Sequence, residues 1–251
     1  TTDVNYNGSS RTYCAWQWST DGASAATNED GSRDSSVMVN TTHGFSIVAY
    51  TGDGSGDDTY GHGLGATPGL IWCKNLDAAQ NWRVFNQGLT SGAANSLFLN
   101  LNNAQSADPD RISAVSSTTF TAAANMNKAE DYIAYCWAPV PGYSAFGNYE
   151  GNSNADGTFI YTGFRPAWIT VKTMDSANDW VIYDSKRDPI NVSDTALRMD
   201  STNSEYSGSG REIDILSNGF KMRTSNGTIN ASATFAYMAF AEFPFKYANA
   251  R

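Results

Sequence analysis

The chain has 251 residues, of which 41% are hydrophobic and 13% aromatic, so it is long enough and apolar enough to fold around a full core. Only 16% of the residues are charged, and the polarity comes from Ser, Thr, Asn and Gly, which favours strands and turns over surface helices. The formal net charge of −9 excludes partners held by counterion release, such as nucleic acid or an anionic membrane. No apolar stretch approaches the roughly 20 residues of a membrane-spanning helix.

Short β-branched and aromatic runs, separated by turns rich in Gly, Asn and Ser, follow one another along the chain. In chain order, these predicted strand regions are residues 13–16, 45–50, 68–74, 81–85, 118–121, 132–135, 142–151, 166–172, 179–183, 218–222 and 237–240. Around eight short strands per hundred residues are typical of an antiparallel sandwich. We therefore expect an all-β fold of two tandem antiparallel β-sandwich domains, of jelly-roll or lectin-like type.

An internal repeat supports the division into two domains. A Gly-aromatic-Ser start and a Tyr-x-Gly end occur both in residues 44–52 and in residues 142–151. Four further identities recur at a spacing of 98 residues: Pro68 with Pro166, Ile71 with Ile169, Lys74 with Lys172, and Trp82 with Trp180. Several identities at one spacing are hard to obtain by chance, so the chain contains two copies of one unit.

Each copy closes with a similar strand, Tyr-Ile-Ala-Tyr at residues 132–135 and Tyr-Met-Ala-Phe at 237–240. A third version, Tyr-Cys-Ala-Trp, stands at residues 13–16 with no body before it. The predicted division is thus residues 1–43 as the last strand and linker of a preceding repeat, 44–141 as the first sandwich and 142–251 as the second. Alternatively, the orphan strand pairs with another subunit.

These landmarks resemble a repeat domain of uncharacterised biochemistry found in tail-fibre and other virion structural proteins of bacteriophages, notably marine phages. The residues that carry the resemblance are 40–52, 61–65, 163–168, 216–221 and the ending 243–251 (Phe-Pro-Phe-Lys-Tyr-Ala-Asn-Ala-Arg). The resemblance spans roughly residues 10–251, and its ending is similar to the natural C-terminus of such proteins. It implies a location on the phage particle and a binding or structural role, and it supplies no catalytic residues.

The acidic turn Asp53-Gly-Ser-Gly-Asp57-Asp58 is the candidate metal site. Carboxylates spaced along a flexible glycine loop can gather the six to eight oxygens that Ca²⁺ prefers. The turn lacks the bidentate Glu of an EF-hand, and a solvated hairpin tip explains the same residues. No other cofactor is expected.

Aromatic residues beside turns are candidates for stacking on a sugar ring. Asn81-Trp82 and Asp179-Trp180 combine an indole with a polar neighbour, although a repeated Trp is equally explained as a core residue of the fold. Tyr60 and Tyr149 follow or precede Gly-rich turns and are expected to be exposed. These six residues form the predicted ligand-binding set.

The three cysteines (Cys14, Cys73 and Cys136) form no CxxC pair and are expected to be buried in strands, although a single disulfide stays open. Two histidines are too few for a zinc site without cysteine ligands. No nucleophile elbow, P-loop or His-Glu-x-x-His motif occurs, so the chain is not expected to be an enzyme.

The expected function is that of a virion structural protein, in a tail fibre, a tail spike or a head decoration, that mediates attachment to a host-surface glycan. Its expected partners are other virion subunits, that glycan and further copies of itself in a homo-oligomer. Two alternatives remain open: a glycan-degrading tail-spike enzyme, and an extracellular filament or adhesin subunit assembled by strand exchange.

Overall fold

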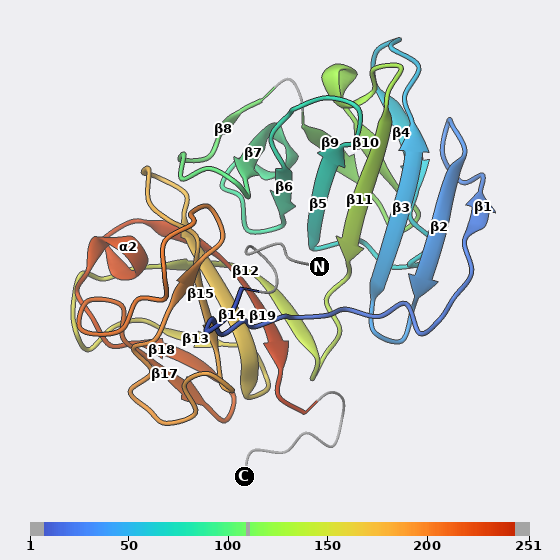
Figure 1. Cartoon of the computed structure of the whole chain (residues 1–251). Helices are drawn as coiled ribbons and strands as arrows, with labels where there is room; N and C mark the ends of the chain where they lie inside the picture. The colour runs from blue at the N-terminus through green and yellow to red at the C-terminus, as the bar shows by residue number, and fades with distance from the viewer. Residues whose placement is uncertain (1–7, 109–110, 244–251) are drawn as a thin grey trace.

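The computed structural model describes residues 8–108 and 111–243, and it is almost entirely antiparallel β-structure, as the sequence predicts. The predicted C-terminal ending lies mostly outside these residues. The strands group into two sets that lie next to each other in Figure 1, one formed by residues 26–137 (the first half) and one by residues 144–241 (the second half). None of the helices within the described ranges has the length and apolarity needed to cross a bilayer.

The first half pairs an eight-stranded sheet with a three-stranded sheet, in the orders β1-β2-β3-β11-β5-β6-β7-β8 and β4-β10-β9. Its strands are β1 (Ala26–Asn28), β2 (Ser35–Asn40), β3 (Phe45–Thr51), β4 (Asp58–Gly61), β5 (Leu70–Asn75), β6 (Arg83–Asn86), β7 (Asn95–Phe98), β8 (Ser106–Ala107), β9 (Ile112–Val115), β10 (Thr119–Ala122) and β11 (Asp131–Trp137). Two short 3-10 helices, η1 (Gly92–Ala94) and η2 (Ala124–Met126), connect them.

The second half repeats this order with the sheets β12-β19-β14-β15-β16 and β13-β18-β17. Its strands are β12 (Ser144–Glu150), β13 (Phe159–Tyr161), β14 (Pro166–Thr173), β15 (Val181–Asp184), β16 (Leu197–Arg198), β17 (Ile213–Leu216), β18 (Gly219–Met222) and β19 (Thr234–Ala241), and its helix is α2 (Gly227–Asn230). Taking β3-β11-β5-β6-β7 and β4-β10-β9 as the reference, every strand has a counterpart in the same position of the second half.

The repeated Tyr-x-Gly motif has the same structural role in both halves. The hydroxyl of Tyr50 donates to the carbonyl of Met126 at 3.0 Å, and that of Tyr149 donates to the carbonyl of Ile229 at 2.6 Å. Two residues later, Gly52 and Gly151 let another backbone segment pass so closely that a Cβ atom would lie 2.1 Å and 1.9 Å from a carbonyl oxygen. The motif therefore fixes the turn before each closing strand.

The two halves share part of one core. Alternate residues of β19 point to opposite faces, and Phe235, Tyr237 and Ala239 fill the core of the second half. The intervening Ala236, Met238 and Phe240 belong instead to the core cluster of the first half. The strands thus separate into two sets, but the packing between them is continuous, and the predicted boundaries 44–141 and 142–251 stay a prediction.

The strand predicted at residues 13–16 is wrong. Residues 11–20 form no regular secondary structure. Trp16 and Trp18 of this segment instead pack against the core residues where the two halves meet, a region that we call the seam. In Figure 1 this N-terminal segment, in dark blue, runs from the second half across to β1. The segment predicted as a linker up to residue 43 contains β1 and β2, which extend the first sheet beyond β3.

Candidate functional site

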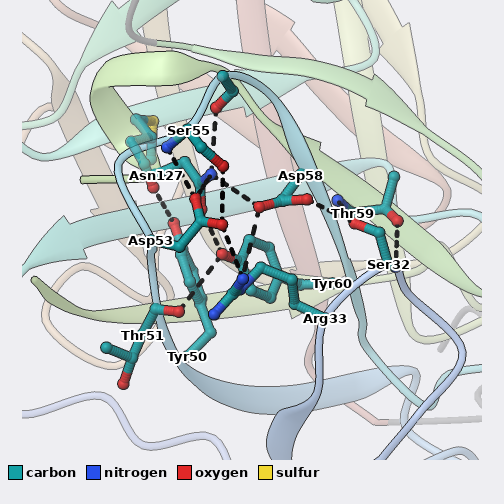
Figure 2. A network of polar contacts seen from close by, with 12 residues as sticks. Ser32, Arg33, Tyr50, Thr51, Asp53, Ser55, Asp58, Thr59, Tyr60 and Asn127 are labelled. Carbon is teal, nitrogen blue, oxygen red and sulfur yellow. Dashed lines mark hydrogen bonds and ion pairs between the residues drawn. The ribbon is translucent and has the colours of Figure 1, made fainter. Parts of the chain in front are cut away.

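The acidic turn that was predicted to bind a metal ion connects β3 to β4. The positive charge beside its carboxylates comes from the guanidinium group of Arg33 (Figure 2). One guanidinium nitrogen of Arg33 lies 2.8 Å from Oδ2 of Asp53, and Nε lies 3.9 Å from Oδ2 of Asp58. Arg33 stands in the turn between β1 and β2, two strands that have no counterpart in the second half. Comparing the two repeats therefore could not have pointed to Arg33 as a partner of the acidic turn.

Asn127 is the buried centre of the same network. Its Nδ2 atom donates to Oδ1 of Asp53 at 3.1 Å, to the carbonyl of Gly56 at 3.1 Å and to Oδ2 of Asp58 at 2.9 Å. Its Oδ1 atom accepts a short hydrogen bond from the hydroxyl of Tyr60. The sequence analysis missed Asn127, although Asn230 stands at the same distance, four residues, before the closing strand of the second half.

Asp53, Asp57 and Asp58 do not converge on one point. Ser55 donates its backbone N–H and its hydroxyl to Asp53, and these bonds, with Arg33 nearby, lower the pKa of that carboxyl. Asp57 turns away and accepts from the backbone N–H of Ala124 at the start of η2. Within the described ranges, no three His, Cys, Asp or Glu side chains are gathered as a metal ion would require. The turn is organised by Arg33 and Asn127.

Beside this network the outer face of the large sheet is hollowed into a cleft of about 730 Å³, which we call the polar cleft. Its residues come from one end of the sheet, where β2 and β11 begin and β3 and β5 end. They are Thr27, Ser32, Arg33, Asp34, Ser35, Ser36, Ala49, Tyr50, Thr51, Leu76, Asp131 and Tyr132. Five of them carry an aliphatic hydroxyl, and Thr51 donates to the carboxylate of Asp131 at 2.6 Å.

A second hollow, of about 300 Å³, lies on the same outer face, and we call it the aromatic cavity. Its walls are Trp18, Phe45, Ile47, Trp72, Trp82, Leu99, Tyr135 and Trp137. The rings of Trp82 and Tyr135 lie nearly parallel, with centroids 6.2 Å apart. The predicted site residue Trp82 is thus half-buried in a cavity wall, and its neighbour Asn81 accepts a hydrogen bond from Asn100.

The other predicted ligand-binding residues do not form a site. Tyr60 and Tyr149 are buried because their rings pack in the interior of each sandwich, so the prediction that they are exposed is wrong. Trp180 is buried in the seam between the halves, where its indole N–H donates to the carbonyl of Phe98 at 2.8 Å. Asp179 is engaged by Arg198 at 2.6 Å and by Arg211 at 3.5 Å.

The cysteines are partly as predicted. Cys73 and Cys136 are buried in β5 and β11, whereas Cys14 is exposed and lies in no strand. All three are free thiols. Burial raises the pKa of Cys73 to about 12, which makes it a poor nucleophile.

Burial also raises the pKa of Asp200, the change expected of a general acid. This carboxylate accepts from the backbone N–H of Trp180 at 3.1 Å, and Asn100 accepts from the equivalent N–H of Trp82 at 2.9 Å. The first half performs the same task with a neutral amide. The arrangement around Asp200 is therefore explained by its structural role.

A protein-family model described as a domain of unknown function (DUF7483) matches residues 1–244, so the chain belongs to that family. Comparisons with curated proteins and with solved structures give no match.

Proposed function

We propose that this DUF7483 chain is a surface component of a phage virion, in a tail fibre, a tail spike or a head decoration, and that it attaches to a host-surface glycan through the polar cleft. The virion location rests on the sequence resemblance described above. The binding role rests on the cleft, and that is the observation on which the proposal depends.

The polar cleft has the size and chemistry that a short glycan requires. Its volume of about 730 Å³ falls within the range of roughly 300–1,000 Å³ that is usual for ligand sites. Ser and Thr hydroxyls, two carboxylates and a guanidinium group line it, and such groups bind sugar hydroxyls by hydrogen bonds. Ser32 also donates to Asp58 at 2.8 Å, which ties the wall of the cleft to the Arg33 network.

The charge of the cleft restricts the kind of glycan. Asp53 and Asp58 already neutralise Arg33, whereas Asp34 and Asp131 lie exposed in the cleft and form no ion pair with any described residue. A glycan with carboxylate or phosphate groups would be repelled by these two aspartates. We therefore expect a neutral or amino-bearing glycan.

The proposed assembly is a homo-oligomer in contact with other virion subunits. Single clefts of this open kind bind weakly, and several copies on one particle raise the overall affinity through avidity. Labelling intact particles with a gold-conjugated antibody against the chain tests the location. Gold at the distal tail would favour host adsorption, gold over the head would favour decoration, and unlabelled particles would contradict the virion location.

Binding is tested by presenting the full chain to envelope polysaccharide from candidate hosts and to an array of neutral, amino and acidic glycans. We expect neutral or amino glycans to be retained, and we expect Ser36→Trp, which places a bulky side chain in the cleft, to abolish retention. Asp34→Asn combined with Asp131→Asn should weaken retention roughly tenfold or more, because both carboxylates would lose their role as strong acceptors.

Asp156→Asn is the control, because Asp156 is also an exposed aspartate, lies in the loop between β12 and β13 of the second half and does not line the cleft. Retention that Ser36→Trp leaves unchanged would disprove binding in the polar cleft. The same samples are assayed for new reducing ends, of which we expect none. Release of reducing ends that Asp34→Asn or Asp131→Asn abolishes would replace the binding role with glycan hydrolysis.

A further inference from the structure

The strand β13 forms one edge of the three-stranded sheet β13-β18-β17 (Figure 1). Ile160 and Phe220 point inward from this sheet into the core of the second half, so the sheet lies on the side of β19 that faces away from the first half. The alternate residues of β13, Phe159 and Tyr161, point outward and are 44% and 67% exposed. The edge of the second half therefore presents two aromatic rings to solvent.

Half of the backbone hydrogen-bonding groups of β13 point away from β18, toward a side of the strand that we call the open edge. The N–H of Met222, at the end of β18, donates to the carbonyl of Thr158 at 3.0 Å. In an antiparallel pair, residues that bond to the neighbouring strand alternate with residues that bond to the other side. The N–H and C=O groups of Phe159 and Tyr161 therefore point to the open edge, and no described residue bonds to them.

The equivalent strand of the first half, β4, has an edge of the same kind that is covered. Its outward backbone groups belong to Thr59 and Gly61. The N–H of Arg33 donates to the carbonyl of Thr59 at 3.3 Å, and the N–H of Thr59 donates to the hydroxyl of Ser32 at 3.0 Å. The hydroxyl of Ser35 donates to the carbonyl of Gly61 at 2.7 Å. Among the described strands, the second half has no counterpart of β1 and β2, so β13 lacks this cover.

The open edge is complementary to itself. When two copies of β13 run antiparallel with Ile160 facing Ile160, Phe159 of each copy faces Tyr161 of the other. Each such pair exchanges two backbone hydrogen bonds, so the outward groups of both strands are all satisfied. The same register places a phenyl ring beside a phenol ring on each side of the two-fold axis, and such cross-strand aromatic pairs stabilise sheets.

The charges beside the open edge do not oppose the association of two copies. Lys221 of β18, which lies next to Phe159 across the sheet, forms an ion pair with Asp156. Asp214 of β17 lies next to Lys221 and forms an ion pair with Arg223 at 3.4 Å. Positive and negative groups thus balance on this face although the whole chain carries a formal net charge of −9. Two copies that meet here are not driven apart by like charges.

We propose that the open edge of β13 binds β13 of a second copy of this chain, antiparallel and centred on Ile160. The two three-stranded sheets then form one continuous sheet across a two-fold axis. This interface gives the proposed homo-oligomer a surface, but it rests on neither the polar cleft nor the virion location. One short strand per copy makes a small interface, so we expect a dissociation constant of roughly 10–100 µM.

Sedimentation equilibrium of the full chain, from about 5 to about 500 µM, measures this association. We expect the average mass to rise with concentration from 27.1 kDa toward twice that value. Phe159→Lys combined with Tyr161→Lys removes both aromatic pairs and places like charges at facing positions, so it should weaken association at least tenfold. The matched control is Ile190→Lys combined with Val192→Lys, which adds the same charge at two exposed apolar residues beside β17 and should leave association unchanged.

A charge-complementary variant tests the register. Phe159→Lys combined with Tyr161→Glu places opposite charges at facing positions of the antiparallel pair, so it should associate more tightly than the variant with two lysines. In a parallel pair the like charges would meet, and an equally weak association would overturn the proposed register. All four substituted positions are exposed, and the midpoint of urea unfolding shows that each variant remains folded.

Three further results would overturn the proposal. The first is an average mass that stays at 27.1 kDa over the whole concentration range. The second is association that the variant with two lysines leaves unchanged, which would locate the interface elsewhere. The third is a limiting mass of three copies, because two identical edges that satisfy each other form only a pair. None of these results alters the retention of glycans measured for the polar cleft, so the two proposals fail separately.

Discussion

The sheet β3-β11-β5-β6-β7 of the first half and the sheet β12-β19-β14-β15-β16 of the second have the same strand order but different surroundings. In β19 all six residues from Phe235 to Phe240 are buried, whereas β11 alternates between buried and more accessible positions over most of its length. The second sheet is covered on both faces, by its own small sheet and by the first half. The first sheet keeps part of its outer face open, and that face holds both the polar cleft and the aromatic cavity.

Residues that are equivalent in the repeat therefore have different roles. Trp82 lines a cavity, and Trp180 is buried in the seam between the halves. Lys74 and Lys172 each donate through Nζ to the carbonyl of the next residue at 2.6 Å, but only Lys172 is fully buried. Duplication of a fold thus preserves hydrogen bonds within each unit, while the contact between the units decides which side chains stay accessible. Four experiments test this comparison.

The largest expected effect separates the two tryptophans. Trp180→Ala should lower the free energy of unfolding by about 3–5 kcal/mol, because it leaves a cavity in the seam and removes the donor to Phe98. Trp82→Ala should cost less than half of that, because the ring is only half-buried. Urea unfolding of both variants measures the difference. Equal losses would mean that Trp82 is as fully packed as Trp180.

The second experiment uses the buried lysine. Burial lowers the pKa of Lys172 to about 8, below its ordinary value of about 10.5. Between these values this lysine is protonated in the unfolded chain and neutral in the folded one, so its contribution to the free energy of unfolding rises with pH. We expect Lys172 to contribute a gain of about 1–2 kcal/mol from about pH 7.5 to 9.5, measured by urea unfolding as the difference between the unmodified chain and Lys172→Met. The difference is needed because burial raises the pKa of Cys73 and Cys136, so that these thiols lower the stability over the same range in both chains.

Lys172→Met should remove this contribution to the pH dependence, whereas Lys74→Met, at the more accessible equivalent position, should keep it. A profile that stays unchanged in Lys172→Met would show that another group titrates. The range ends near pH 9.5 because tyrosines of the unfolded chain begin to ionise above it, and burial raises the pKa of Tyr50 and Tyr149 in the folded state.

The third experiment tests what the halves have in common. Tyr50→Phe and Tyr149→Phe each remove one buried hydroxyl that donates to a backbone carbonyl, and each should cost about 1 kcal/mol. The two losses should be additive, since the sites are distant and share no partner. Strongly unequal losses in urea unfolding would contradict an equivalent role for the Tyr-x-Gly motif in the two halves.

The smallest effect concerns the two loops. Hydrogen bonds from Ser55 lower the pKa of Asp53, whereas the bond from Lys221 lowers that of Asp156. Both carboxylates stabilise the fold above their unfolded pKa and lose this contribution as the pH falls below it, so Asp53→Asn and Asp156→Asn should each flatten the acid side of the stability profile. High salt should remove the Asp156 effect and spare most of the Asp53 effect, because it screens the exposed Lys221–Asp156 pair. Equal salt sensitivity would contradict this difference.

Particular residues show how far the site could be predicted. Trp82 was a candidate because an indole beside Asn81 is a local pattern, and it does line a cavity. Tyr60 and Tyr149 differ from the prediction because their neighbouring turns are exposed while their rings point inward onto other rings. Arg33 and Asn127 reach the acidic turn from distant parts of the chain, so no local pattern links them to Asp53.

The sequence by itself determined the all-β fold and the repeated unit, because strand patterning, turn residues and the Tyr-x-Gly motif act over short distances. Only the tertiary structure decided that Arg33 supplies the charge of the acidic turn, that residues 13–16 form no strand, and that one outer sheet face stays open. These outcomes depend on how the two halves and the N-terminal segment pack together, and packing joins residues that are far apart in the chain. Two units of similar sequence therefore share a fold, and their mutual contact leaves the polar cleft and the aromatic cavity on only one of them.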